Sequence, residues 1–110
     1  MTSNSDAPVG VFEEQVLLAV LRTGDAFGMS VRREIENVTG RDVAIGAVYA
    51  TLDRLEAKGL VDSYRGTAAD GRERRLFQVT RDGLLALAES RAMRERLWRG
   101  VNVLKLLEEY

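Results

Sequence analysis

The chain has 110 residues, of which 45% are hydrophobic and 30% charged, a composition typical of one small folded domain. It contains no cysteine and no histidine, which excludes disulfides, thiolate or imidazole metal sites and the commonest general base. The 16 basic and 17 acidic residues nearly balance. We therefore expect no cofactor and no metal. Because no apolar run is long enough to span a bilayer, we also expect no membrane association and a cytoplasmic protein.

Three helices are predicted in the first half of the chain. Hydrophobic residues recur at helical spacing in residues 11–22 and 29–38, and a glycine follows each stretch. A third amphipathic segment covers residues 45–58 and is ended by Gly59. Residues 1–9, which are largely polar and contain the only proline, are predicted to form a mobile N-terminal arm.

A hairpin and a final helix are predicted in the second half. Residues 60–64 and 75–79 favour short strands, and the loop between them contains an Asp-Gly turn signal. Thr80 is a suitable N-cap for the final helix. That helix is predicted to run from residue 81 towards residue 109, with a bend or a frayed end at Gly100.

The third predicted helix has two faces at about 100° per residue. Four residues fall on one face, which we expect in the core: Ile45, Val48, Leu52 and Leu55. The opposite face begins with small residues and ends with basic ones: Ala47, Ala50, Thr51, Arg54 and Lys58. Such a face suits entry into the DNA major groove, although an ordinary alanine-rich amphipathic helix has the same pattern. Tyr49 lies between the faces, where its hydroxyl either donates to a phosphate oxygen or stays in water while the ring covers the core.

Four arginines lie in or beside the predicted hairpin loop: Arg65, Arg72, Arg74 and Arg75. Side chains alternate along a strand, so Arg74 and Arg75 cannot share a face, and only part of the cluster can reach DNA. We expect Arg72 and Arg74 to contact phosphates, with Asp70 and Glu73 weakening the local positive field. The alternative is a charged hairpin tip that is simply solvated.

The third helix and its exit carry a specific residue pattern. The motif G-x-x-Y-x-x-L-x-R-L-x-x-x-G-L-V spans residues 46–61, and GRERRLFQVTRDG follows at residues 71–83. With Gly28 before the second helix, these motifs resemble the PadR family of bacterial transcriptional regulators over residues 11–90. The resemblance implies a winged-helix fold, a homodimer and operator DNA binding, usually with repression. The short C-terminal part resembles the compact class with a single C-terminal helix.

Apolar residues form an interrupted stripe along the last predicted helix: Leu84, Leu87, Leu97, Trp98, Val101 and Leu104. A 30-residue helix would be about 45 Å long, more than so small a body can cover. We expect the stripe to form the interface of a two-fold homodimer, the alternative being that the helix folds back onto the first helix. Trp98 either fills this interface or lines a pocket for a small aromatic effector.

The predicted fold class is mainly α with a small β-hairpin. Residues 10–80 would form a winged helix-turn-helix DNA-binding domain, and residues 81–110 a C-terminal dimerisation helix. The sequence thus predicts a sequence-specific transcriptional regulator, most simply a repressor that binds a palindromic double-stranded operator as a homodimer. The alternative is a winged-helix protein-interaction module without DNA binding. An enzyme is not expected, because catalysis would rest on exposed carboxylates without a visible partner site.

Overall fold

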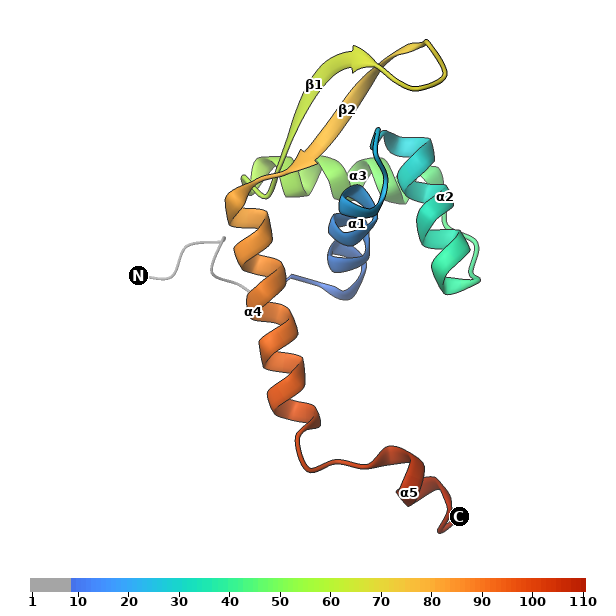
Figure 1. Cartoon of the computed structure of the whole chain (residues 1–110), viewed down its shortest axis with the longest axis vertical. Helices are drawn as coiled ribbons and strands as arrows, with labels where there is room; N and C mark the ends of the chain where they lie inside the picture. Colours follow the sequence, from blue (N-terminus) through green and yellow to red (C-terminus); the bar gives the residue numbers. More distant parts are fainter. Residues whose placement is uncertain (1–8) are drawn as a thin grey trace.

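The computed structural model describes residues 9–110, which form five helices and two strands (Figure 1). The elements are, in chain order, α1 (Val11–Arg22), α2 (Gly28–Thr39), α3 (Ile45–Ala57), β1 (Val61–Thr67), β2 (Glu73–Val79), α4 (Arg81–Trp98) and α5 (Val103–Leu107). The predicted fold class, mainly α with a small β-hairpin, is confirmed. The predicted N-terminal arm lies, except for Val9, outside the described residues. Within residues 9–110, no helix combines the length and the apolar character needed to cross a bilayer.

The first three helices pack around one hydrophobic core. In α3 the side chains of Val48, Leu52 and Leu55 are 0% exposed, and the predicted core face of this helix is confirmed at these positions. Ile45, at the start of the helix, is only half-buried. Each fully buried aliphatic side chain stabilises the fold by about 1.5–3 kcal/mol, so this face fixes how α3 is rotated on the body.

The hairpin is longer, and its loop shorter, than the sequence predicts. The antiparallel strands pair from Val61 opposite Val79 to Thr67 opposite Glu73, so much of the predicted loop belongs to the ladder. Gly71 in the turn has φ of 81°, a left-handed conformation that glycine adopts without steric cost. The polar residues near the tip have weak strand preference, but cross-strand pairing extends the strands through them.

The predicted final helix is interrupted. α4 ends at Trp98, and Gly100 has φ of 80°, which is incompatible with continuing a right-handed helix. The chain resumes in α5, where the Asn102 side chain accepts a hydrogen bond of 3.0 Å from the backbone N–H of Lys105. The sequence located the break correctly at Gly100, but the prediction of one helix from residue 81 towards residue 109 is wrong.

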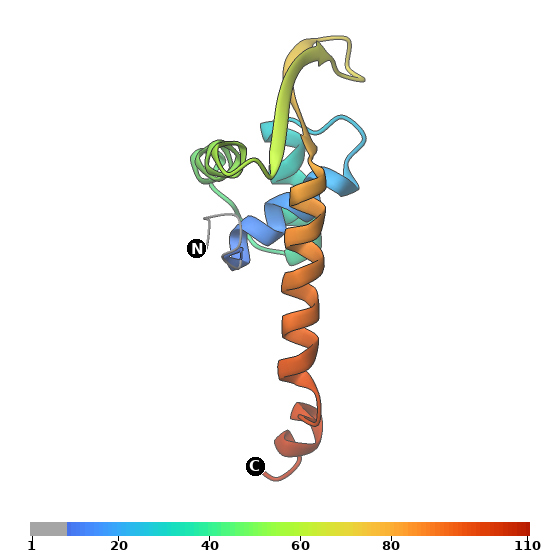
Figure 2. The ribbon, with the colours of Figure 1, turned by 90° about the vertical axis from the view of Figure 1, so that its left-hand side faces the viewer.

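α4 contacts the body of the molecule from its start as far as Arg94. Gly83, Ala86 and Ser90 are buried against it, and Arg94 donates a hydrogen bond to Glu14 of α1, which raises the pKa of Arg94. Beyond this ion pair α4 projects away from the other helices, and α5 lies at its far end in both views (Figures 1 and 2). The end of the chain is therefore an extension rather than part of the core.

Glu13 connects the start of α1 to the end of α3. Its carboxylate accepts hydrogen bonds from the Gly10 backbone N–H (2.9 Å) and from Lys58 Nζ (2.8 Å). Burial raises the pKa of Glu13, but the hydrogen bonds from Lys58 and Gly10 outweigh it, and the net shift is downward. A carboxyl group whose pKa is lowered on folding stabilises the protein above its unfolded pKa and loses that contribution as the pH falls.

We predict that Glu13→Gln lowers the free energy of unfolding at pH 7 by about 1 kcal/mol. The difference from wild type should shrink as the pH falls below about 4.3, the ordinary pKa of glutamate, because the wild-type carboxyl is then increasingly protonated. Urea unfolding at pH 7 and at acid pH measures the difference in stability between Glu13→Gln and wild type. Glu89→Gln is the control, because Glu89 is exposed. A destabilisation that is the same at both pH values would contradict the role given to the ionised carboxylate.

Candidate nucleic-acid interface

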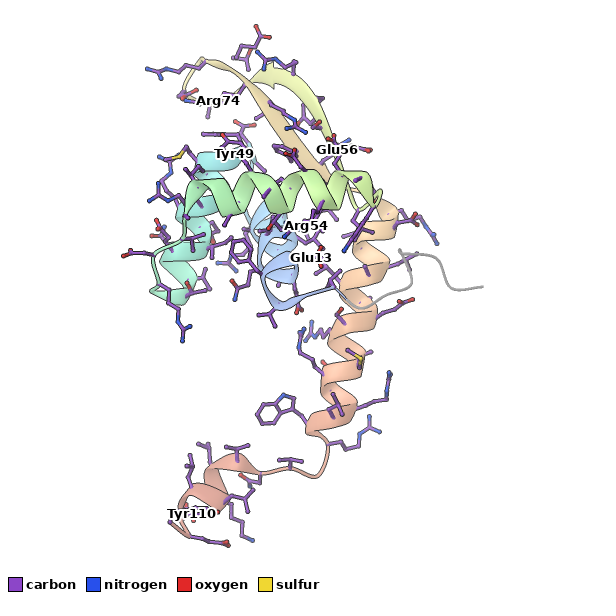
Figure 3. The ribbon with its side chains drawn as sticks, turned by 180° about the vertical axis from the view of Figure 1, so that it is seen from behind. Glu13, Tyr49, Arg54, Glu56, Arg74 and Tyr110 are labelled. Carbon is purple, nitrogen blue, oxygen red and sulfur yellow. The ribbon has the colours of Figure 1, made fainter. Side chains whose placement is uncertain are left out.

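The outward face of α3 is open along its whole length (Figure 3). Exposed residues recur at helical spacing along its centre: Gly46, Ala50, Asp53 and Ala57. Ala47 and Arg54 are also exposed on one flank and Tyr49 on the other. The prediction that Ala47, Ala50 and Arg54 lie on the outer face is confirmed. The face is narrow and largely without side-chain bulk, so another molecule can approach the helix backbone closely.

Thr51 was predicted to lie on this outer face, and that prediction is wrong. Its side chain is 1% exposed and belongs to the buried row that includes Val48, Leu52 and Leu55. The hydroxyl is satisfied there, because Thr51 Oγ1 accepts a hydrogen bond of 2.9 Å from Arg54 Nη2. Thr51 therefore positions Arg54 from within the core and is not itself presented to a partner.

Tyr49 packs across the start of α2. A Cβ atom added to Gly28 would lie 2.3 Å from Tyr49 Cζ and 2.5 Å from its hydroxyl oxygen. Only glycine leaves room for the ring at this point, which explains why these two motif residues occur together. The Tyr49 side chain remains 42% exposed, and its hydroxyl lies beside the N-terminal end of α2.

Asp53 places a carboxylate at the centre of the outward face, which the sequence interpretation missed. The guanidinium of Arg75 in β2 offsets this negative charge. Arg75 Nη1 lies 3.2 Å from Asp53 Oδ1, and Arg75 Nη2 lies 2.7 Å from Glu56 Oε1. The pKa of Glu56 is lowered by its hydrogen bond from Ser63 and further by Arg75. The helical spacing of Gly46, Ala50 and Asp53 was a signal that could have located Asp53. Arg75 thus ties the hairpin to α3 and reduces negative charge beside the open face.

Arg74 points to the other side of the hairpin, as strand alternation requires. Its guanidinium carbon lies 4.3 Å from the centre of the Phe27 ring, and Nη2 lies 2.7 Å from Asp70 Oδ2. The hydrogen bonds from Arg74 and from the Arg72 backbone N–H lower the pKa of Asp70. Arg74 is thus held between the hairpin and the link before α2, and this placement does not support its predicted role as a phosphate contact.

Arg72 and Arg65 are the arginines of the hairpin that point into solvent. Arg72 is exposed at the tip, and Arg65 is exposed with only a long ion pair of 3.4 Å to Glu73. Of the four arginines in this region, two are used to join the hairpin to the body and two remain accessible. The positive charge available at the tip is smaller than the sequence alone indicates.

Most of the predicted dimer-interface side chains are exposed in the single chain: Leu84 (49%), Leu97 (71%), Trp98 (59%), Val101 (49%) and Leu104 (75%). Leu87 differs, because it is partly buried and packs against the chain's own core. Trp98 also lines a surface hollow of about 680 Å³ with residues of the turn and α5. The exposed members form an apolar surface that nothing in the described part of the chain covers.

Three helices, of which the third presents an open face beside a two-stranded wing, define a winged helix-turn-helix, as the sequence predicts. A model of the PadR-like family of transcriptional regulators matches residues 17–89, from α1 into the first half of α4. The chain belongs to this PadR-like family. It is accordingly a transcriptional regulator and not an enzyme.

The chain is also similar to individual proteins, one of which is a named transcriptional regulator. The transcriptional regulator Rv3488 of Mycobacterium tuberculosis is 45% identical over 62 residues, which cover 56% of this chain and 57% of that protein. An uncharacterised protein, protein X of Lysinibacillus sphaericus, is 30% identical over 78 residues, or 69% of this chain and 72% of that one. The crystal structure of a PadR-like transcriptional regulator from Bacillus cereus has a TM-score of 0.67 at 20% identity, covering 84% of this chain and 95% of that chain. At that identity the structural match supports the fold alone.

Proposed function

We propose that this regulator binds operator DNA through the outward face of α3 and the tip of the hairpin. In this proposal α3 enters the major groove and the wing lies along the adjacent backbone, the arrangement to which the open face is suited. The main support for this proposal is Gly46. No contact within the chain requires glycine at this position.

Gly46 differs from the other motif glycines in its surroundings. A Cβ at Gly28 or Gly83 would collide with neighbouring atoms, and Gly59 has φ of 77°. At Gly46 a Cβ would meet nothing within 4 Å, and the residue has ordinary helical geometry. Glycine costs a helix up to about 1 kcal/mol relative to alanine, although less in the first turn. A close approach by an external partner accounts for glycine at this exposed position.

Phosphate contacts are proposed at both edges of this face. The hydroxyl of Tyr49 lies beside the N-terminus of α2, where free backbone N–H groups favour an anion. Arg72 at the wing tip and Arg54 on the opposite flank are exposed cations. These contacts fix the orientation of the protein on the duplex, while Ala47, Ala50 and Asp53 face the base edges. Because this face has few side chains that can read bases, the sequence preference of the protein would depend in part on DNA shape.

We further propose that the regulator acts as a homodimer on a palindromic operator and represses transcription. The exposed apolar side chains along α4, namely Leu84, Leu97 and Trp98, favour pairing with a second copy. A two-fold dimer presents two α3 helices to two half-sites, which is why a palindrome suits it. The activity requires access to the chromosome, so we assign the chain to the cytoplasm.

The experiment that tests DNA binding compares Gly46→Ala with wild type on a duplex selected from a random library. We predict that the added methyl group weakens binding by about tenfold, or about 1.4 kcal/mol, while thermal stability stays the same or rises slightly. Fluorescence anisotropy measures the affinity. Gly24→Ala is the matched control, because Gly24 is also exposed and a Cβ there would meet nothing within 4 Å.

Two outcomes would contradict the proposal. Equal affinity of Gly46→Ala and wild type would show that DNA does not approach this face closely. If the folded dimer selects no duplex and binds none at about 50 mM salt, where phosphate contacts are strong, the chain is better described as a winged-helix protein-interaction module. The carboxylate of Asp53 on the outward face is the feature that favours this alternative.

An effector site at Trp98 is proposed as part of the dimer. The indole is 59% exposed and borders the hollow at the turn between α4 and α5, so a planar apolar compound could stack on it. As Trp98 is the only tryptophan, its emission should respond to planar aromatic compounds that change DNA affinity. If no compound that alters DNA binding changes the emission, Trp98 is only an interface residue.

A further inference from the structure

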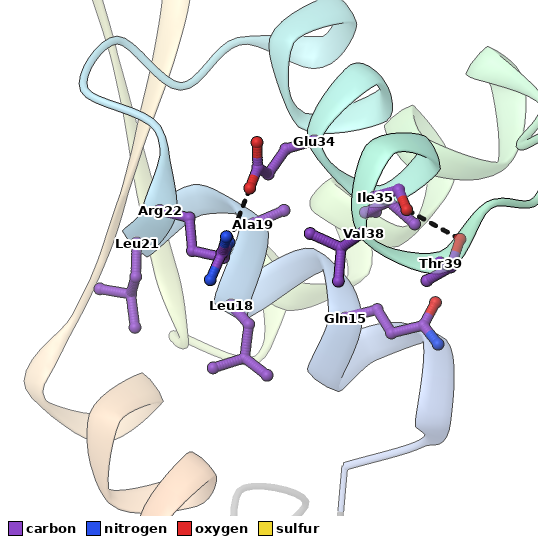
Figure 4. A pocket seen from close by; sticks show the side chains of 9 residues that line it. All are labelled: Gln15, Leu18, Ala19, Leu21, Arg22, Glu34, Ile35, Val38 and Thr39. Atoms are coloured by element: carbon purple, nitrogen blue, oxygen red, sulfur yellow. Dashed lines mark hydrogen bonds and ion pairs between the residues drawn. The ribbon is translucent and has the colours of Figure 1, made fainter.

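We propose that α5 of one copy docks into the groove between α1 and α2 of a second copy. This inference rests on the proposed homodimer and adds a specific contact to it. The groove has a volume of about 310 Å³, and Figure 4 shows the nine side chains that line it. Its apolar lining includes Leu18 and Leu21 of α1 and Ile35 and Val38 of α2, and the ion pair between Arg22 and Glu34 lies at its rim.

The groove is an apolar surface left open by the chain's own fold. Leu18 is 42% exposed, Leu21 50% and Val38 60%, although α1 and α2 otherwise pack closely. Leaving these side chains in water is unfavourable by about 25 cal/mol for each Å² of apolar surface. The groove therefore favours an apolar occupant.

α5 is an exposed apolar segment of the kind that could occupy this groove. Its sequence VLKLL contains four aliphatic residues, none of which is buried, and Leu104 is 75% exposed. A five-residue helix without tertiary packing is too short to be stable alone in water. Figures 1 and 2 both show α5 at the far end of α4, away from the body. A second copy is thus the nearest source of a surface that could hold it.

Two leucines of α1 connect the groove to the start of the proposed α4 interface. Leu18 and Leu21 line not only the groove but also a second hollow between α1 and α4, together with Leu84 and Leu87. A partner chain whose α4 pairs along this side reaches α1 first, and its α5 then meets the groove. The turn at Gly100 gives the change of direction that such a path needs.

The rim of the groove and the docking segment each carry charges of both signs. At the rim, Arg22 is paired with Glu34 at 2.6 Å, yet the Arg22 side chain remains 60% exposed. The docking segment carries Lys105 within α5 and Glu108 and Glu109 just after it. These groups can extend the Arg22–Glu34 pair into a larger network of alternating charge, which selects this occupant over an uncharged apolar ligand.

Cysteine cross-linking between two variants of the full chain tests the contact, because the natural chain has no cysteine. Val38→Cys and Leu104→Cys, carried on chains of different mass, are mixed, allowed to exchange and oxidised mildly. We expect a mixed covalent dimer in at least about tenfold greater yield than in a control mixture of Leu104→Cys with Val11→Cys. Val11 is a matched control, since it is an exposed valine of α1 (78%) outside the groove.

A second variant tests the energetic contribution without cysteines. Leu107→Glu should weaken the dimer at least about tenfold in sedimentation equilibrium, because it places a charge in an apolar contact, while Val11→Glu should have no such effect. A dimer unaffected by Leu107→Glu, or equal cross-linking in the two mixtures, would overturn α5 docking even if the wild-type dimer binds DNA. A monomeric wild type would overturn the dimer as well. Specific cross-linking without DNA binding would support docking and contradict only the proposed DNA function.

Discussion

Replacing Gly83 by alanine is expected to lower the free energy of unfolding by about 3 kcal/mol, a large effect for a single methyl group. The new Cβ would lie 2.2 Å from the Leu60 carbonyl oxygen and 2.6 Å from Val79 Cγ1. The neighbouring backbone cannot retreat easily. Thr80 fixes it by accepting a hydrogen bond from the Gly83 N–H (3.0 Å) and donating one to the Gly59 carbonyl (2.7 Å). Gly83 therefore lets α4 start directly against the base of the hairpin.

Thermal unfolding at a fixed protein concentration measures this effect. The melting temperature of Gly83→Ala should fall by more than about 10 °C, given a domain of this size. Gly24→Ala, at which a Cβ would have open space, should melt close to wild type. Equal melting temperatures for the two variants would show that the junction between β2 and α4 adapts far more easily than its geometry indicates.

Ala50→Glu is expected to reduce DNA affinity at least about 100-fold without destabilising the fold. Ala50 lies at the centre of the outward face of α3 and is exposed, and glutamate is a good helix former. A carboxylate at this point would face the negatively charged groove and add to the charge of Asp53. Juxtaposed like charges cost several kcal/mol at an interface, and 100-fold corresponds to about 2.7 kcal/mol.

The control for this variant is Asn37→Glu. It makes the same change in net charge at an exposed position near the end of α2, remote from the hairpin (Figure 1). Its affinity for DNA should stay within about threefold of wild type at 150 mM salt, where distant charges are screened. Similar losses in both variants would mean that net charge, and not the α3 face, governs binding.

The sequence predicted those features that depend on local periodicity. The buried residues of α3 follow the spacing of an amphipathic helix, and Asp-Gly at the turn and Thr80 at the start of α4 have strong local preferences. The family motifs add contacts that periodicity cannot reveal. The fit of Tyr49 over Gly28 is one of these, since it joins residues 21 positions apart and depends on the angle between α2 and α3.

The errors arose where tertiary packing determines the environment of a polar side chain. Thr51 is polar but lies in the buried row, and Arg54 satisfies its hydroxyl. Arg74 is charged but is held over Phe27, a contact that requires the hairpin to fold towards the link before α2. Asp53 was overlooked because the pairing partner that makes it tolerable, Arg75, is 22 residues away. Residue type alone does not predict which side of a helix or strand such groups occupy.

Amide chemical-shift mapping of the dimer with a selected duplex tests whether the outward face of α3 contacts DNA. If α3 enters the major groove, the shifts should concentrate in residues 46–54 of α3, at the N-terminus of α2 and at residues 70–72 of the wing tip, with α5 unaffected. A random duplex should perturb Tyr49 and Arg72 but leave Ala47 and Ala50 less changed, since phosphate contacts do not depend on sequence. Shifts that avoid α3, or that appear on α4 and α5 instead, would contradict the proposed interface.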